Sequence, residues 1–294
     1  MTYSIVARDQ QTGELGVAVQ SHWFAVGPIV PWARPGVGAV ATQANVRVAH
    51  GPDALELLAG GASAGEALER LLAADLGAAS RQLAIVDANG RVAAHTGHSC
   101  MAEAGHVTGE QVSCQANIMA SPAVWPRMLE AFTTAAGPLA GRLLAALDAA
   151  EAAGGDIRGR QSAALLVVPA TGEPWEAEVR LHVEDHPEPL VELRRLYELH
   201  RAYELAGRGD ELTGEGRHDE AAVLYDQAFA LAPGNHELLF WAGLGAVQTG
   251  ELERGLGLVR EAIAMQPGWS LLLPRLSAEV APAAPTVCAH LGLA

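Results

Sequence analysis

The chain has 294 residues, of which 50% are hydrophobic, and a formal net charge of −15. All 19 of its basic residues are arginines, which excludes enzyme classes that need a lysine side chain, such as Walker A nucleotide hydrolases, pyridoxal enzymes and Ser-Lys hydrolases. The acidic balance, without any basic run, also argues against nucleic acid as a partner, because counterion release requires clustered Lys or Arg.

The start of the chain is predicted to consist of strands. Apolar runs at 3–8 and 14–21 flank a polar turn that contains Gly13, a pattern typical of a β-hairpin. Further apolar runs at 26–30 and 37–44 predict two more strands, separated by a turn with two prolines and a glycine.

The pattern then changes to a helical period. Leucines recur at helical spacing over 52–59 and 64–73. Ser63 followed by Glu66 at the third helical position predicts a capping box at the start of the second of these helices.

The remaining elements of this part complete an alternation of strand blocks and helix pairs. In chain order, the sequence predicts strands at 82–87, 91–96 and 112–119, helices at 122–135 and 138–153, and strands at 162–168 and 177–183. Strand blocks separated by helix pairs favour an α+β domain with helices covering antiparallel sheets. We therefore expect a four-layer αββα sandwich over residues 1–189.

The proline-rich stretch at 186–189 predicts a domain boundary, and residues 190–294 are expected to form an all-α domain with an irregular tail at 281–285. Three pairs of residues lie 34 positions apart: Gly216 and Gly250, Ala228 and Ala262, and Pro233 and Pro267. This period, with Gly at the turn and a terminal Pro, resembles tetratricopeptide repeats. Such a domain suggests a protein partner and a homo-oligomer.

Thr2 is the candidate nucleophile. A threonine after Met1 permits removal of that methionine, which exposes Thr2 at the start of a strand. The hydroxyl of an N-terminal threonine can attack a carbonyl while its own amine, with an ordinary pKa of about 8, accepts the proton.

A set of motifs spread over residues 2 to about 190 is specific enough to indicate a protein family. They are Ser4-Ile-Val-Ala-Arg-Asp9, Gly16-Val-Ala-Val-Gln-Ser-His-Trp-Phe24, Val30-Pro-Trp-Ala-Arg34, Gly36-Val-Gly-Ala-Val-Ala-Thr-Gln43, Thr96-Gly97, Gln115-Ala-Asn117, Gly154-Gly-Asp156 and Gly159-Arg-Gln-Ser-Ala-Ala-Leu165. With these motifs the chain resembles a bacterial family, domain of unknown function ten twenty-eight, which is grouped by fold with the N-terminal nucleophile (Ntn) hydrolases. The resemblance implies an αββα fold and a hydrolase-like site at Thr2.

The sequence departs from these relatives in one respect that bears on catalysis. Many relatives have Ser-Lys where this chain has Ser21-His22, and proteasome-type subunits use a lysine near the nucleophile to lower its pKa. His22 or Arg34 would have to replace that lysine here.

Polar residues at strand ends are the candidate substrate-binding groups. In the fold implied by the resemblance they surround the start of the first strand, where they could orient a carbonyl or donate to an oxyanion, or simply form buried hydrogen bonds. Two arginines in the loop at 154–161 could bind a carboxylate or phosphate, or be solvated. The candidates are Ser21, His22, Thr42, Gln43, Asn45, Gln115, Asn117, Arg160 and Ser162.

No cofactor or metal is expected. His95, His98 and Cys100 have ligand-like spacing but lack an evident fourth ligand, which leaves a zinc site as a weaker alternative. The odd number of cysteines, the absence of a signal sequence and the absence of a long apolar run predict a cytoplasmic protein without membrane contact.

Two functional hypotheses follow from these residues. The first is an Ntn-type hydrolase of a small amide or related C–N bond, with Thr2 as nucleophile. The second is a non-catalytic protein that binds a small ligand or acts in assembly, and whose helical tail recruits a protein partner.

Overall fold

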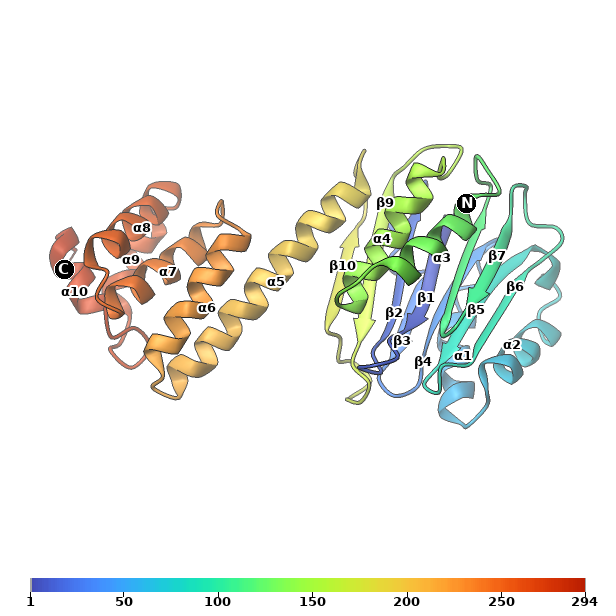
Figure 1. Cartoon of the computed structure of the whole chain (residues 1–294), viewed down its shortest axis with the longest axis horizontal. Helices are drawn as coiled ribbons and strands as arrows, with labels where there is room; N and C mark the ends of the chain where they lie inside the picture. The colour runs from blue at the N-terminus through green and yellow to red at the C-terminus, as the bar shows by residue number, and fades with distance from the viewer. Residues whose placement is uncertain (1, 294) are drawn as a thin grey trace. The chain divides into compact units, whose positions relative to one another are not determined.

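A computed structural model describes residues 2–293 (Figure 1). The chain divides into two compact units between Arg194 and Arg195. This division lies inside the long helix α5 (Pro189–Gly214), and each unit is described by itself below.

The first unit alternates strand blocks with helix pairs. Its elements are β1 (Thr2–Arg8), β2 (Leu15–Ser21), β3 (Pro31–Arg34), β4 (Gly38–Ala44), α1 (His50–Ala59), α2 (Ala64–Ala73), the 3₁₀ turn η1 (Ala78–Ser80), β5 (Arg81–Asp87), β6 (Val92–Thr96), β7 (Gly105–Gly109), β8 (Val112–Asn117), α3 (Val124–Thr134), α4 (Leu139–Ala152), β9 (Ser162–Val168) and β10 (Val179–Val183). The predicted capping box is confirmed, because the Ser63 hydroxyl accepts from the Glu66 N–H and the Glu66 carboxylate accepts from the Ser63 N–H.

The strands form two antiparallel sheets, one in the order β10-β9-β2-β1-β8-β7 and the other in the order β3-β4-β5-β6. The predicted hairpin is confirmed as β1 and β2. Thr2 lies opposite Ser21 on one neighbouring strand and opposite Asn117 on the other. The first residue of β1 is therefore central in its sheet.

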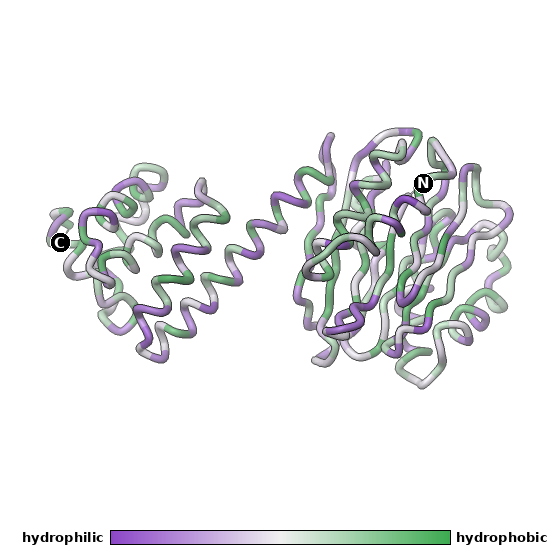
Figure 2. The backbone as a smooth tube through the Cα atoms, in the orientation of Figure 1, coloured by the Kyte–Doolittle hydropathy of each residue, from purple (hydrophilic) through white to green (hydrophobic). Residues whose placement is uncertain are grey.

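The sheets pack face to face, and apolar side chains from both fill the space between them, among them Val6, Val17 and Val86. Helices α3 and α4 contact the outer face of the six-stranded sheet, while α1 and α2 contact that of the four-stranded sheet (Figure 1). The expectation of a mixed α and β domain with antiparallel sheets is confirmed. Figure 2 shows hydrophobic stretches along both the strands and the helices of this unit.

Three local predictions were wrong. Residues 26–30 form a loop and not a strand, since Gly27-Pro28 interrupts the run, although Val26 and Val30 are buried. The edge strand β7 was missed because glycines occupy both of its ends. Part of the tail expected to be irregular belongs to helix α10 (Ala284–Leu291), which begins with a proline in its first turn.

The second unit is helical, as predicted. It contains the rest of α5 and then α6 (His218–Leu231), α7 (His236–Gln248), α8 (Leu252–Met265), α9 (Gly268–Leu272), the 3₁₀ turn η2 (Leu273–Arg275) and α10. Helix α5 alternates between hydrophilic and hydrophobic stretches along its length, as a helix with one apolar face does (Figure 2).

Glycines allow α7 and α8 to approach closely. A Cβ atom added at Gly255 would lie 2.5 Å from the Gly243 carbonyl oxygen, and one added at Gly243 would lie 3.0 Å from the Gly255 carbonyl oxygen. The repeat pattern has a small residue at the position of Gly255. Here only glycine fits, because an added Cβ atom would meet the backbone of α7.

We predict that Gly255→Ala lowers the free energy of unfolding by about 1–3 kcal/mol, since the added methyl group overpacks the contact with α7. The matched control is Gly257→Ala on the same helix, where an added Cβ meets nothing within 4 Å. This control should raise stability by up to about 1 kcal/mol through helix propensity. Urea unfolding followed by circular dichroism measures both, and equal effects of the two substitutions would contradict the packing argument.

Candidate functional site

The site is built around Thr2, the first residue of the central strand β1. Its side chain is buried, with 5% of the residue exposed, and its Oγ1 lies 3.0 Å from Oγ of Ser21 on β2. Antiparallel pairing fixes this contact, because the two residues are direct partners in the β1–β2 register. The hydroxyl pair is thus positioned by the sheet itself.

Two side-chain amides hold the Thr2 carbonyl. Gln43 Nε2 from β4 donates to the Thr2 oxygen at 3.2 Å, and Asn117 Nδ2 from β8 donates to it at 3.3 Å. Both amides also donate to Oε1 of Gln82 on β5, at 2.7 and 2.9 Å. The start of β1 is therefore clamped from its own sheet and from the facing one.

Gln82 is the residue that sequence reasoning missed. It is fully buried, and its Nε2 donates to the carbonyl of Ala116 at 2.9 Å and to Thr96 Oγ1 at 2.9 Å. In the sequence, Gln82 is visible only as a polar residue at the start of the apolar run 82–87. Its role depends on partners that lie on other strands. Gln82 connects the two sheets directly behind Thr2.

The polar network continues inward from the site. Ser4 Oγ donates to Gln43 Oε1 at 2.6 Å, Gln115 Nε2 donates to Ser4 Oγ at 2.7 Å, and Ser113 Oγ donates to Gln115 Oε1 at 2.9 Å. All four residues are buried. Gln115 thus lies on the predicted face of its strand, but deep in the network and not at an open surface.

A cavity of about 580 Å³ opens in front of Thr2. Five of the predicted residues line it, which brings together groups from β1, β2, β4, the segment after β4, and β8: Thr2, Ser21, Gln43, Asn45 and Asn117. Its volume is in the range of small-molecule sites. The structure therefore brings together about half of the candidate residues.

Thr42 lies away from this cavity. Neighbouring residues of a strand point to opposite faces, so Thr42 faces away from the Gln43 side. Its Oγ1 donates to the carbonyl of Arg47 at 3.2 Å. Gln115, inside the network, does not line the cavity either.

His22, Arg160 and Ser162 also do not line the cavity. His22 Nδ1 lies 3.3 Å from the Arg160 carbonyl oxygen. The Arg160 guanidinium donates to Glu151 at 2.6 Å. Ser162 Oγ donates to the Trp23 carbonyl at 2.5 Å and accepts from the N–H of Val26 at 3.1 Å, so it supports the cavity-lining loop after β2.

Arg158 is the arginine of the 154–161 loop that lines the cavity. Its guanidinium donates to both carboxylate oxygens of the buried Asp156, at 3.2 and 2.9 Å. Asp156 also accepts from the backbone N–H of His22 at 3.2 Å. The loop at 154–161 therefore reaches the cavity as predicted, but the arginine that lines it is Arg158 and not Arg160. Arg34 pairs with Glu56 and does not line the cavity.

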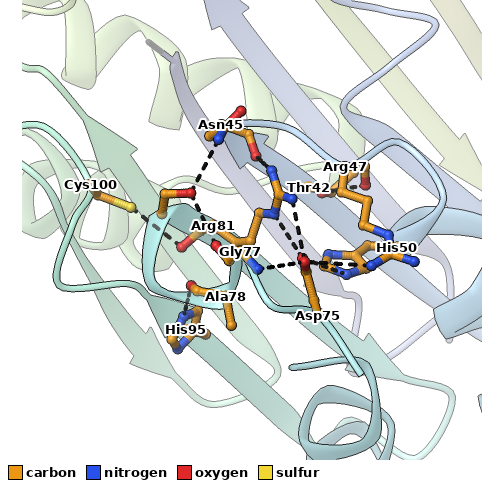
Figure 3. A network of polar contacts seen from close by, with 11 residues as sticks. Thr42, Asn45, Arg47, His50, Asp75, Gly77, Ala78, Arg81, His95 and Cys100 are labelled. Carbon is orange, nitrogen blue, oxygen red and sulfur yellow. Dashed lines mark hydrogen bonds and ion pairs between the residues drawn. The ribbon is translucent and has the colours of Figure 1, made fainter. Parts of the chain in front are cut away.

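Figure 3 shows a second network, which holds one rim of the cavity. Arg81 Nε donates to Asp75 at 2.8 Å, and the same guanidinium donates to the Asn45 carbonyl. Cys100 Sγ donates to the Arg81 carbonyl at 3.4 Å. The hydrogen bond from Arg81 holds the pKa of Asp75 well below its usual range. Asp75 thus keeps Arg81 in place, and Arg81 binds two residues that line the cavity.

His50 lies at the base of this network with 1% of its surface exposed. Its Nε2 lies 3.3 Å from an Asp75 oxygen. Burial lowers the pKa of His50 below its ordinary value, Asp75 acts in the opposite direction, and Arg47 and Arg81 add to the lowering. The neutral imidazole is therefore the favoured form in the folded chain.

Within residues 2–293, no helix has the length and apolar character needed to cross a membrane. The same residues contain no group of three His, Cys, Asp or Glu side chains that could hold a metal ion. Two members of the weaker zinc alternative bind backbone groups, since His95 Nε2 lies 2.9 Å from the Ala78 carbonyl and Cys100 donates to Arg81.

Comparisons with known proteins agree with the sequence motifs. The model of a family of unknown function, DUF1028, matches residues 2–193. The crystal structure of protein SPO2555 from Silicibacter pomeroyi, a DUF1028 protein, is 34% identical with a TM-score of 0.62, and the match covers 67% of this chain and 88% of that one. No curated protein matches.

We predict that Gln82→Met destabilises the first unit, because the amides of Gln43 and Asn117 lose a shared acceptor. A buried donor left unsatisfied costs about 1–3 kcal/mol. The matched control is Gln10→Met at an exposed position, which should change the free energy of unfolding by less than about 0.5 kcal/mol. Urea unfolding measures both, and a Gln82→Met protein as stable as the control would contradict the clamp.

A pH dependence follows from His50. Its folded pKa is lowered, so below the unfolded value of about 6.5 the unfolded chain binds a proton that the folded chain does not, and stability falls as the pH falls. We expect His50→Gln to make this fall between pH 7 and pH 5 shallower. Urea unfolding at a series of pH values measures the slope. His98→Gln, at an exposed position, should leave the slope unchanged, and equal slopes for all three proteins would refute the assignment.

Proposed function

We propose that this chain, which belongs to the DUF1028 family of unknown function, is an N-terminal nucleophile hydrolase that cleaves a small amide or related C–N bond. The single observation that carries the proposal is the position of Thr2. Its hydroxyl lies 3.0 Å from Ser21 Oγ, at the start of a central strand and at the wall of a cavity of about 580 Å³.

In the first step, removal of Met1 frees the amine of Thr2. Thr2 Oγ1 then attacks the substrate carbonyl carbon while its proton passes to the amine, directly or through Ser21 Oγ. When the tetrahedral intermediate collapses, the C–N bond breaks, and the same proton goes to the leaving nitrogen. The products of this step are a free amine and an ester on Thr2.

In the second step, water hydrolyses the ester. The Thr2 amine accepts a proton from the water as its oxygen attacks the ester carbon, and then returns the proton to Thr2 Oγ1 as the ester bond breaks. A carboxylic acid leaves and the hydroxyl is restored. The chain contains no lysine, so this amine is the only primary amine available to the mechanism.

The clamp on Thr2 supports this role for the residue. Gln43 and Asn117 bind its carbonyl, so we assign them to positioning the nucleophile and not to binding an oxyanion. A fixed main chain holds the hydroxyl at the cavity, and such preorganisation removes reorientation from the reaction barrier. Gln82 acts through these two amides in the same way.

The arrangement of elements supports an Ntn-like αββα assignment. Two antiparallel sheets face each other, helix pairs cover their outer faces, and the N-terminal strand is central in its sheet. For the second unit, the 34-residue period and the close contact of α7 with α8 support a tetratricopeptide-like assignment. We assign to residues 190–294 the binding of a protein partner.

The test is the intact mass of the protein after incubation with a β-lactone. We expect a mass that lacks Met1 and gains one acyl group, with the group on the Thr2 peptide after digestion. Thr2→Ala should abolish labelling, and Thr2→Ser should retain it because a serine offers the same hydroxyl and amine. Ser21→Ala should slow labelling by about 10²-fold if Ser21 relays the proton.

The matched control is Thr133→Ala at an exposed position, which should be labelled at the rate of the natural chain. Full retention of Met1 in protein that hydrolyses or labels would overturn the mechanism. Labelling that persists in Thr2→Ala would move the nucleophile elsewhere. A protein that is processed at Met1 and stays unlabelled would favour a non-catalytic ligand-binding role.

A further inference from the structure

We infer that the substrate of this site is an uncharged carboxamide, or a related uncharged C–N compound, that carries an apolar aliphatic or aromatic group. The inference rests on the proposed function, since it takes Thr2 as the group that meets the carbonyl. Its basis is that the cavity divides into a polar end and an apolar wall.

The polar end of the cavity lies at Thr2, and the amides there are already engaged. Gln43 and Asn117 donate to the Thr2 carbonyl and to Gln82. The hydroxyls of Thr2 and Ser21 lie beside these amides. What this end offers a ligand is therefore the pair of hydroxyls, which suits a polar group such as the carbonyl of an amide.

The apolar wall consists of the half-buried Ile29 and Val46, with Val26 and Val30, each 1% exposed, supporting it from the core. Val26 and Val30 are buried members of the core between the sheets, and Ile29 packs against them. The Ser162 hydroxyl fixes the loop that carries the wall, because it accepts from the N–H of Val26 and donates to the carbonyl of Trp23. A fixed apolar wall attracts an apolar group and gives no hydrogen bonds to water.

Two large apolar side chains continue this wall into solvent. Trp23 is 58% exposed and Met101 is 67% exposed, and both line the cavity. Large exposed apolar groups at a cavity mark ligand-binding surfaces, since a ligand that covers them removes apolar area from water. The apolar part of the substrate therefore extends from the wall toward Trp23 and Met101.

The charges at the cavity favour an uncharged substrate. Among the described residues that line it, Arg158 is the one with a charged side chain, and its guanidinium is paired with the buried carboxylate of Asp156. A cationic substrate would meet no acidic group there. An anionic one would have to compete with Asp156 for the guanidinium.

The first experiment measures binding of hexanamide and acetamide to the full chain by isothermal titration calorimetry. The two amides share the carbonyl end and differ only in methylene groups, each of which favours binding by about fourfold when buried. We expect hexanamide to bind about 10-fold or more tightly than acetamide. Trp23→Ala should reduce this ratio, while the matched control Trp175→Ala, 74% exposed and outside the cavity, should leave it unchanged.

A ratio near one, or a ratio that Trp23→Ala does not lower, would overturn the inference. A second pair of probes, β-lactones with a methyl and a hexyl substituent, separates this inference from the proposed function. Faster labelling of Thr2 by the hexyl compound supports both. Equal labelling rates support the nucleophile and overturn the apolar substrate, whereas preferential binding of hexanamide with no labelling supports the apolar ligand and overturns the hydrolase.

Discussion

The site depends on one buried carboxamide, that of Gln82. Its oxygen accepts from Gln43 and Asn117, and its nitrogen donates to groups on β6, β7 and β8. The carboxamides of Gln43, Gln82 and Asn117 are all buried, so one of them left without a partner would carry the cost of desolvation. Because the network includes both sheets and the Thr2 carbonyl, the spacing of the sheets and the position of the candidate nucleophile are determined together.

Much of this could be predicted where the pattern is local. The hairpin that opens the chain follows from two apolar runs and a polar turn, and the capping box at Ser63 follows from two residues. The period of a strand also places Gln115 and Asn117 on one face. The same rule places Thr42 and Gln43 on opposite faces of β4, and only Gln43 lines the cavity.

Other features depend on residues that are distant in sequence. Gln82 has no local mark of its role, since its importance comes from partners on β4, β6 and β8. Arg158 and Arg160 are two positions apart, yet one lines the cavity beside Asp156 and the other pairs with Glu151. The conformation of the loop determines which arginine reaches the cavity, and the spacing of the two residues in the sequence does not. The apolar run at 26–30 is a loop interrupted by Gly27-Pro28, yet Val26 and Val30 still pack into the core between the sheets.

The division between polar and apolar contacts gives the cavity its chemistry. In the middle of the sandwich the facing strands present Val, Ala and Leu, while at the end near Thr2 the same alternation presents Ser, Thr, Gln and Asn. At the end near Thr2 the buried side chains satisfy one another's hydrogen bonds, which avoids the cost of leaving polar groups unpaired away from water. Apolar side chains of the loop after β2 line another part of the cavity. The position of Thr2 and the apolar character of the rest of the cavity are therefore determined by different residues.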